Sequence, residues 1–580
     1  MGCQYLAFVS SNGSPGTDVE ETTAARLREL GFSRRIASRA LTLFASADTP
    51  TLTLPGGSII VGHIFSEEGC ALDADSTILR GATHAHVRNA LLRGCWGEYV
   101  LLQPASASWE GMAITRDPSG GVRCLYSIEH GSGFVTSNMS LASELGIHRR
   151  SIDWEHIAHR LSYPHLPTSR TGLVGIDELL PGTSLRVIGS QTSTTQEWSP
   201  WDFVEAGQRF RSVDEASAAV RDAVSRVVRT WANTDESLLL ELSGGLDSSI
   251  VAACLKGTNA RVACCTAITP FPGADERRYA RLMADRLGIE LVAEALGFDL
   301  ARFDAPPPLH SVTPRVAALQ HAANEVFEIA ADRHGVSSFF SGAGGDSVFS
   351  YLRSAAPAAD AFKERGFNTG VAAIHDLAEL HQCTVWKAAR LTLRKLIRRP
   401  KPPAQPNFMF LASDAPPTPH VHPWFSAPPS ALPGDRERIS VLSGTQTFRD
   451  CAPRGETRWM RMPLISQPVM EACLRAPSWM WITDGMNRAV ARRAFSNDLP
   501  DEVFNRRSKG SFMTYSGAVY RRNQGRIGTF LLEGELEAHG LLDTAALRQF
   551  LERDLAPRDE SFMRIFELCM IESWVRQQAA

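Results

Sequence analysis

Residues 243–249 read Ser-Gly-Gly-Leu-Asp-Ser-Ser and stand between the apolar run 238–242 and a second apolar segment, 250–255. This order predicts a buried strand, a glycine turn and the start of a helix. Glycines allow a tight turn that exposes successive backbone N–H groups, and the helix directs the positive end of its dipole at the same point. The stretch therefore predicts a cradle for an anion.

The side chains of this turn point to a polyphosphate held together with a metal ion. Ser243, Ser248 and Ser249 supply hydroxyl donors, whereas Asp247 would repel a bound phosphate. A Mg²⁺ ion between carboxylate and phosphate removes that repulsion. The turn is neither a Walker A loop nor a dinucleotide-binding fingerprint. We expect a pyrophosphate and Mg²⁺ site with ATP as the substrate; a plain strand-to-helix connection is the alternative.

The composition is that of a globular protein with several domains. The chain has 580 residues, 44% of them hydrophobic, and a net charge of −3, which does not favour a general nucleic-acid binder. No apolar run approaches the ~20 residues of a membrane span, and the start lacks a signal peptide. We expect a cytoplasmic protein that binds no membrane. Its 11 cysteines include no Cys-x-x-Cys pair, which predicts reduced thiols.

Two domains are expected, 1–205 and 206–580. The first is predicted to be β-rich, because short apolar runs alternate with turn sequences. In the second, strands and helices alternate between 210 and 355, which predicts a doubly wound parallel sheet and an α/β fold. Ligands of such sheets bind at the carboxyl ends of the strands. A further glycine-rich turn, 341–346, follows another predicted strand, so both turns are expected to face one pocket.

The segment 400–433 contains 11 of the 33 prolines, which predicts an irregular insert or linker. A basic run without an acidic residue, Lys387 to Lys401, precedes it. Two interpretations stay open. The two segments line or gate a substrate cavity or dock a partner, or they are a solvated helix face followed by a linker.

The second domain resembles the asparagine synthetase family. The turn at 243–249 is similar to the SGGxDS loop of ATP pyrophosphatases, which cut ATP between the α and β phosphates. Further family motifs follow in order and with fitting spacing: Gly273–Gly288, Ser341–Asp346, Met462–Ile465 and Arg507–Phe512. The resemblance implies an ATP-pyrophosphatase fold, like that of the adenine nucleotide alpha hydrolases.

Carried over residue by residue, the resemblance implies roles for the side chains of the site. Asp247 and Asp346 would share Mg²⁺, and Lys509 would reach the phosphates and stabilise charge during amide formation. A turn cap for Asp346 and a surface lysine for Lys509 are the alternatives. The nucleotide-binding set that the family implies is Leu242, Ser243, Gly244, Gly245, Asp247, Ser248, Ile268, Ser341 and Gly342.

The first domain resembles the family's glutamine-hydrolysing domain, which has an Ntn-type amidotransferase fold. The matching segments are Gly94–Tyr99, Arg116–Tyr126 and Ala142–Leu145. Working members need cysteine as the first mature residue, so that its own α-amine acts as the base. Here removal of Met1 would expose Gly2 rather than Cys3, and Ser66 stands where the family has its oxyanion asparagine. We expect a structural domain without glutaminase activity.

One position in the second turn bears on the reaction. Asparagine synthetases carry Glu there and β-lactam synthetases carry Tyr, whereas this chain has Ala343, which can do no acid–base chemistry. Asp376 and Glu379 are candidates for the missing group, with exposed helical carboxylates as the alternative.

Among family branches, the chain looks most like the lasso peptide cyclases. These enzymes lack the N-terminal cysteine, adenylate an Asp or Glu side chain of a peptide, and close it onto the peptide's own amine. The resemblance implies a macrolactam synthetase that acts on a leader-processed precursor peptide and releases AMP and pyrophosphate. A maturation protease and a leader-peptide-binding protein are the expected partners, and no nucleic acid is expected. The alternatives are a β-lactam or other small-molecule amide synthetase, an asparagine synthetase using free ammonia, and a non-enzymatic scaffold.

Overall fold

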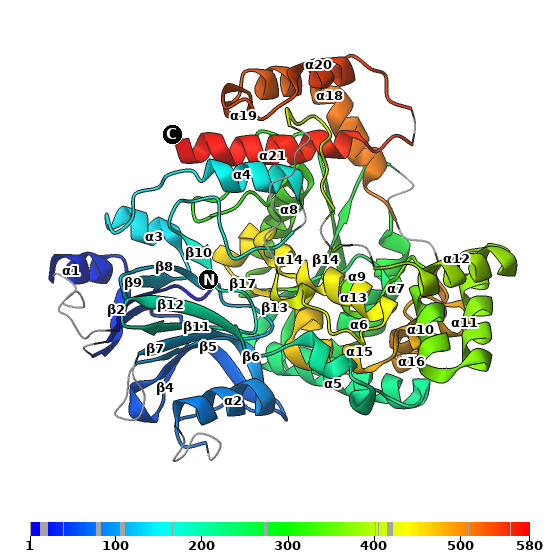
Figure 1. Cartoon of the computed structure of the whole chain (residues 1–580), viewed down its shortest axis with the longest axis horizontal. Helices are drawn as coiled ribbons and strands as arrows, with labels where there is room; N and C mark the ends of the chain where they lie inside the picture. Colours follow the sequence, from blue (N-terminus) through cyan, green and yellow to red (C-terminus); the bar gives the residue numbers. More distant parts are fainter. Residues whose placement is uncertain are drawn as a thin grey trace.

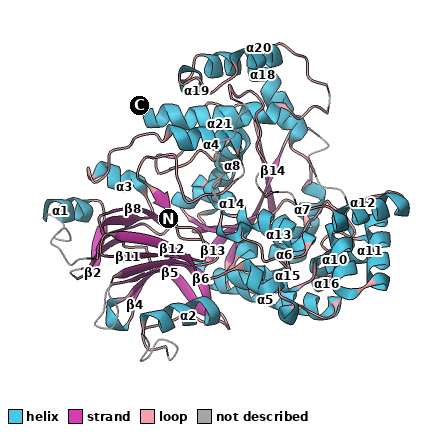
Figure 2. Ribbon diagram, viewed as in Figure 1, coloured by secondary structure: helices cyan, strands magenta, loops and turns pink. Residues whose placement is uncertain are grey.

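The computed structural model describes residues 2–579 with short interruptions, and it shows a β-rich part followed by a part built on a parallel sheet (Figures 1 and 2). The stretches inside this range that it does not describe are 12–20, 39, 77–82, 105–110, 165, 272–274, 401, 404, 414–421, 508–509 and 557.

The β-rich part contains two antiparallel sheets, each with six strands among the described residues. The first consists, in spatial order, of β10 (Asp177–Glu178), β8 (Leu125–Glu129), β9 (Ser132–Thr136), β1 (Tyr5–Ser10), β3 (Leu41–Ser46) and β2 (Phe32–Ala37). The second consists of β12 (Gln191–Gln196), β11 (Thr183–Ile188), β7 (Met112–Arg116), β6 (Cys95–Gln103), β5 (Ile59–Ser66) and β4 (Thr51–Thr53). Buried residues of both sheets, such as Val100 and Val135, form one core.

Four helices accompany these sheets: α1 (Glu21–Glu29), α2 (His84–Gly94), α3 (Met139–Glu144) and α4 (Trp154–Ser162). The last of them lies beside the C-terminal helix α21 (Phe562–Ala579), although the two are about 400 residues apart in the chain (Figure 1). Arg564 of α21 donates a hydrogen bond to the carbonyl of Leu161 at 2.7 Å. The β-rich part is thus joined to the very end of the chain.

The second part is built on a parallel sheet with five strands among the described residues. Its spatial order is β15 (Leu291–Ala295), β14 (Arg261–Ile268), β13 (Ser237–Glu241), β16 (Ser338–Ser341) and β17 (Trp459–Arg461). Helices that cover it include α5 (Val213–Asp235), α6 (Leu246–Leu255), α7 (Arg277–Leu287) and α8 (Ala318–His334).

The central strand β13 is buried on both faces, which explains its unbroken apolar sequence. Leu238 and Leu240 belong to the core that contains α5 and α6, whereas Leu239 packs in a separate cluster with residues of α8. Successive side chains of a strand point to opposite faces, so each face of the sheet receives its own helices. The predicted α/β fold class, with an antiparallel β-rich part followed by a part built on a parallel sheet, is confirmed.

The rest of the described chain is mostly helical, as expected. After the short α9 (Gly345–Val348), the helices are α10 (Ala356–Arg365), α11 (Phe367–Leu380), α12 (Val385–Ile397), α13 (Pro433–Ser443), α14 (Gln446–Asp450), α15 (Gln467–Arg475), α16 (Ala489–Ala494), α17 (Asp501–Phe504), α18 (Met513–Leu532), α19 (Glu535–Ala538), α20 (Thr544–Leu551) and α21. Within the described part of 400–433, regular structure is confined to a short 3₁₀ turn, Pro423–Phe425, before α13 begins.

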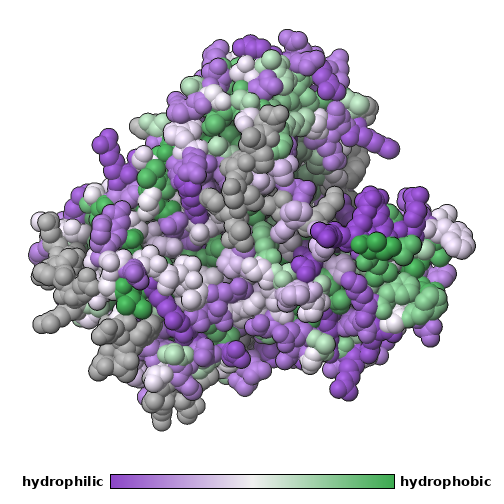
Figure 3. All heavy atoms as spheres, in the orientation of Figure 1, coloured by the Kyte–Doolittle hydropathy of each residue, from purple (hydrophilic) through white to green (hydrophobic). Residues whose placement is uncertain are grey.

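The surface over α11 and α12 carries a patch of apolar side chains beside hydrophilic ones, seen on the right in Figure 3. Trp386 is 86% exposed and Ile397 is 73% exposed, and basic residues such as Arg390 and Arg394 lie on the same helix α12. None of the described helices is both long enough and apolar enough to cross a membrane.

A buried arginine holds the two parts of the molecule together. Arg461, at the end of β17, is 0% exposed. Its guanidinium donates to both carboxylate oxygens of Asp235 at 2.8 Å and to Glu98 at 3.1 Å. Asp235 ends α5, whereas Glu98 lies on β6 of the antiparallel part. The guanidinium also lies 4.0 Å from the ring centroid of Trp231, and Arg449 forms an ion pair with the other oxygen of Glu98 at 2.8 Å.

Replacing Arg461 with Met is expected to lower the free energy of unfolding by about 3–5 kcal/mol, because it leaves Asp235 and Glu98 buried without their shared cation. Scanning calorimetry and urea unfolding measure the loss. Arg278→Met is the control, since Arg278 is mostly exposed in its ion pair with Glu502, and such pairs contribute little. Equal losses in the two variants would contradict this assignment.

Candidate functional site

The strand order brings the two glycine-rich turns to one point of the sheet. The chain runs outward from β13 to β14 and β15, then returns to place β16 on the other side of β13. The carboxyl ends of β13 and β16 therefore meet where the strand order reverses, which is where open α/β sheets bind ligands. The turn 243–249 follows β13, and the turn 341–346 follows β16. The expectation that both turns face one pocket is confirmed, since both line the same cavity.

The two turns approach so closely that only glycine fits between them. A Cβ atom on Gly342 would lie 2.6 Å from the backbone nitrogen of Ser248. A Cβ atom on Gly345 would lie 2.4 Å from the carboxyl carbon of Asp247. The glycines of the second turn therefore allow its backbone to lie directly against the start of α6.

The first turn forms an anion cradle at the N-terminus of α6. The Ser243 N–H donates to the Ser248 hydroxyl at 3.2 Å, and the Gly245 N–H donates to the Ser243 hydroxyl at 3.3 Å. Gly244 has φ +71°, in the left-handed region that glycine favours. Helix α6 begins after Gly245 without a side-chain cap, so its dipole faces the cavity as in helix N-termini that bind phosphate.

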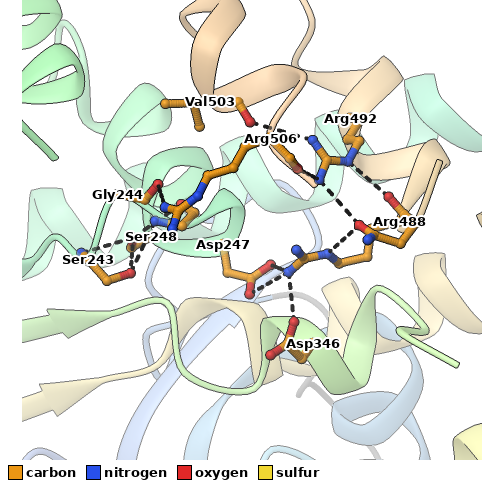
Figure 4. A network of polar contacts seen from close by, with 11 residues as sticks. Ser243, Gly244, Asp247, Ser248, Asp346, Arg488, Arg492, Val503 and Arg506 are labelled. Atoms are coloured by element: carbon orange, nitrogen blue, oxygen red, sulfur yellow. Dashed lines mark hydrogen bonds and ion pairs between the residues drawn. The ribbon is translucent and has the colours of Figure 1, made fainter. Parts of the chain in front are cut away.

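The two predicted metal ligands converge on one cation. Nη1 of Arg488 lies 3.0 Å from each carboxylate oxygen of Asp247 and 2.7 Å from Oδ1 of Asp346 (Figure 4). Carboxylate oxygens, like those that face the Arg488 cation here, are ligands that Mg²⁺ prefers. The donor set fits a Mg²⁺ ion held by Asp247 and Asp346, with phosphate oxygens completing its coordination.

Two further arginines lie in the same network. Arg492 donates to the carbonyls of Asn487 at 2.9 Å and Arg506 at 2.8 Å, and burial lowers the pKa of Arg492 to about 10, so it stays charged at neutral pH. Arg506 donates to the carbonyl of Gly244 at 3.1 Å (Figure 4), and it also pairs with Glu276. Sequence reasoning did not assign Arg488 or Arg492 to the site. No local pattern marks them, because Arg488 reaches the turns from 142 or more residues away and Arg492 lines the same cavity as the turns.

The cavity beside this network has a volume of about 450 Å³, within the range of small-molecule sites. Of the nucleotide-binding residues expected from sequence, those that line it are Leu242, Ser243, Gly245, Asp247, Ser248, Ser341 and Gly342. Ile268 is not in the lining, which contains its neighbour Ala267. The carbonyl of Ile268 accepts from the Leu296 N–H at 2.7 Å. Gly244 also lies outside the lining, although its carbonyl binds Arg506.

The remaining residues that the sequence singled out differ in their outcome. Lys509 lies outside the described residues, between Arg506 and Gly510, which both bind Glu276. Ala343 does line the cavity. Asp376 and Glu379, the candidates for an acid–base group, lie on α11 outside the lining, where Glu379 pairs with Arg507 at 3.1 Å. None of the described residues of the basic run or of 400–433 lines it either.

The fold and the site define an α/β enzyme that binds a polyphosphate at the switch point of its sheet. A family model described as asparagine synthase matches residues 219–576. The match spans more than half of the chain, so the chain belongs to the asparagine synthase family. It is an ATP-dependent carbon–nitrogen ligase, as the sequence predicted.

Comparison with other proteins adds no closer assignment. No curated protein matches the chain. Similar solved structures include one titled as the allosteric regulatory enzyme of purine biosynthesis, with 9% identity, a TM-score of 0.20, and coverage of 54% of this chain and 78% of that chain. The glutamine phosphoribosylpyrophosphate amidotransferase from B. subtilis has 10% identity, a TM-score of 0.20, and coverage of 59% and 84%. The glutamine-dependent NAD⁺ synthetase from Acinetobacter baumannii has 11% identity, a TM-score of 0.20, and coverage of 61% and 77%.

Replacing Arg488 with Met removes the cation between Asp247 and Asp346 and is expected to lower Tm in metal-free buffer. Mg²⁺ is then expected to raise the Tm of this variant more than that of the wild type, because the ion no longer competes with a guanidinium. Thermal unfolding with and without MgCl₂ measures both effects. Adding Asp247→Asn should remove the extra response; an equal Mg²⁺ response in wild type and Arg488→Met would contradict a shared metal site.

Proposed function

We propose that the protein is a macrolactam synthetase that closes a side-chain carboxylate of a peptide onto the peptide's own N-terminal amine. The proposal rests on a cavity that suits ATP in a carbon–nitrogen ligase, together with the expectation that the amidotransferase-like domain lacks the features that release ammonia. An amine that arrives with the substrate needs no such supply.

The first step is activation of an Asp or Glu carboxylate. A carboxylate oxygen attacks the α-phosphorus of ATP, the bond to the β-phosphate oxygen breaks, and pyrophosphate leaves with that electron pair. The hydroxyls of Ser243 and Ser248 and the uncapped start of α6 hold the departing phosphates. Arg488, Arg492 and Arg506 place positive charge beside them. Bound Mg²⁺, held by Asp247 and Asp346, would neutralise part of the phosphate charge.

The second step is ring closure. The peptide's amine attacks the acyl carbon, loses a proton, and AMP leaves with the electrons of the acyl–oxygen bond. Both reacting groups belong to one molecule, so a cavity that holds them together gains the proximity advantage, worth up to about 7–11 kcal/mol. Besides Asp247 and Asp346, the carboxylates that line the described cavity are Glu241 and Glu276, each paired with an arginine.

The state of Cys3 supports the loss of glutamine hydrolysis. Burial raises the pKa of the Cys3 thiol to about 12, so the nucleophilic thiolate is absent at neutral pH. Beside it in one cavity lie His63 and Glu98. Burial lowers the pKa of His63 to about 3, so this side chain is neutral. The two carboxylate oxygens of Glu98 form ion pairs with Arg449 and Arg461.

The other catalytic feature of a glutaminase is also missing. Ser66, at the position of the family's oxyanion asparagine, ends β5, and its hydroxyl donates to Glu68 at 2.7 Å. We therefore assign residues 1–205 a structural and not a hydrolytic role, with residues 206–580 as the synthetase domain.

A leader-processed precursor peptide is the proposed substrate. A maturation protease that exposes its N-terminal amine and a leader-peptide-binding protein are the proposed partners. The requirement for ATP favours the cytoplasm as the place of action.

Co-expression with a precursor peptide and its protease is expected to give a core peptide lighter by one water, detected as intact mass. Asp247→Asn should reduce this product at least about 100-fold, because the turn loses a charged metal ligand. Asp222→Asn, an exposed carboxylate on α5, is the matched control and should leave the product unchanged. Pyrophosphate exchange driven only by a small β-amino acid would instead indicate a small-molecule amide synthetase.

Cys3→Ala is expected to leave ATP-dependent product formation unchanged, because the thiol takes no part in the reaction. Glutamine added to the purified enzyme should release no glutamate. A coupled glutamate dehydrogenase assay measures this release. Glutamate formation that disappears in Cys3→Ala would show that the amidotransferase-like domain is active after all.

A further inference from the structure

A second cavity adjoins the one that contains the two turns. It has a volume of about 310 Å³, and Leu319 and Gln320 at the start of α8 line both cavities. Other elements also contribute to both: Thr447 lines the second cavity and Phe448 the first. A molecule in the second cavity therefore lies next to the nucleotide site and is separated from it by only a few side chains.

The walls of this second cavity are mostly apolar. They come from α8, α14, α18 and α21 of the synthetase part and include Val519, Phe566, Met570 and Ile571. Such walls suit a hydrocarbon body better than a phosphate or a sugar. One charged residue in the lining, Arg160, comes instead from α4 of the β-rich part.

Arg160 is a buried cation that has no hydrogen bond or ion pair among the described residues, although the charges of Glu567 and Asp450 act on it from further away. Its exposed fraction is 8%, and its Nε atom has no hydrogen-bond partner. A buried, unpaired guanidinium is costly, because the interior does not replace the water it has lost. The other arginines of the cavity region are satisfied: Arg315 pairs with Asp450 at 2.8 Å, and Arg564 pairs with Glu567 at 2.9 Å.

Arg160 is charged and has the geometry to bind an anion. Burial, followed by the nearby charge of Arg315, lowers the pKa of Arg160 to about 10, so it remains protonated at neutral pH. Glu567 also lines the cavity and pairs with Arg564 on the same helix, and its negative charge partly opposes the lowering of the Arg160 pKa. A guanidinium is planar and can bind a carboxylate through two parallel N–H groups.

We infer that the second cavity binds an apolar segment of the substrate and that Arg160 pairs with a carboxylate of that segment other than the one that is activated. The cavity's position lets such a substrate extend a second carboxylate toward the ATP phosphates. The amidotransferase-like domain thereby acquires a role in substrate recognition. The identity of the substrate as a peptide rests on the proposed function; the carboxylate subsite does not.

Binding is tested without catalysis, using N-acetyl-L-leucine as the probe and its neutral amide, N-acetyl-L-leucinamide, as the comparison. The acid is expected to raise the Tm of the wild type, and the amide is not. Arg160→Met should abolish the response to the acid, whereas Arg160→Lys should keep part of it. Arg149→Met is the matched control, since Arg149 is an exposed arginine of the same domain, and it should respond like the wild type.

The ligand-free proteins give a second readout that separates binding from structure. Arg160→Met is expected to have a Tm equal to or above that of the wild type, because it removes an unpaired buried charge. A lower Tm would assign Arg160 a structural role and overturn the inference. So would equal stabilisation by acid and amide, or an undiminished response in Arg160→Met.

In cyclisation assays, Arg160→Met should raise the KM for the peptide about 10- to 100-fold, the loss expected for a charge-assisted hydrogen bond, with little change in kcat. The KM for ATP should stay the same. If N-acetyl-L-leucine binds through Arg160 but no peptide is cyclised, the subsite stands and the proposed function fails. A fall in kcat with an unchanged peptide KM would contradict the subsite.

Discussion

The close approach of two glycine turns at the switch point of the sheet is the constraint on which the rest of the site depends. Because Gly345 lies against Asp247, the carboxylates of Asp247 and Asp346 converge on a single nitrogen of Arg488. A side chain at Gly342 or at Gly345 would push the two turns apart. The parallel sheet supplies this geometry, since β13 and β16 are neighbours that the chain enters about a hundred residues apart. The surrounding arginines then make the cradle electropositive.

The β-rich part contacts the synthetase part at two separate places. The cavity that contains Cys3 also contains Glu98, which is bound by two arginines of the synthetase part. On the other side of the same domain, α4 packs along α21 and brings Arg160 to a cavity next to the nucleotide site. Through these contacts the β-rich part contributes Arg160 and Pro164 to the wall of the cavity beside the nucleotide site.

Local sequence predicted the parts of the site that form locally. The turn at 243–249 could be read directly, because strand, glycines and helix follow one another within a few residues. Arg488 and Arg461 could not be read in this way, because their partners lie 241 and 363 residues away in the chain. Ile268 was expected at the adenosine site from resemblance alone, yet the described cavity reaches only as far as Ala267 on that strand. Side-chain pairing across the fold decided the places of Arg488 and Arg461.

The contacts of Arg461 limit how freely the two parts of the chain can be exchanged. One guanidinium serves carboxylates from both halves of the chain, Asp235 and Glu98, while it stacks on Trp231. If the first domain were replaced by that of a relative, Arg461 would lose the carboxylate of Glu98 unless the new domain carried an acidic residue at that position. A chimera that joins the β-rich part to another synthetase part therefore has to carry both sides of this ion pair.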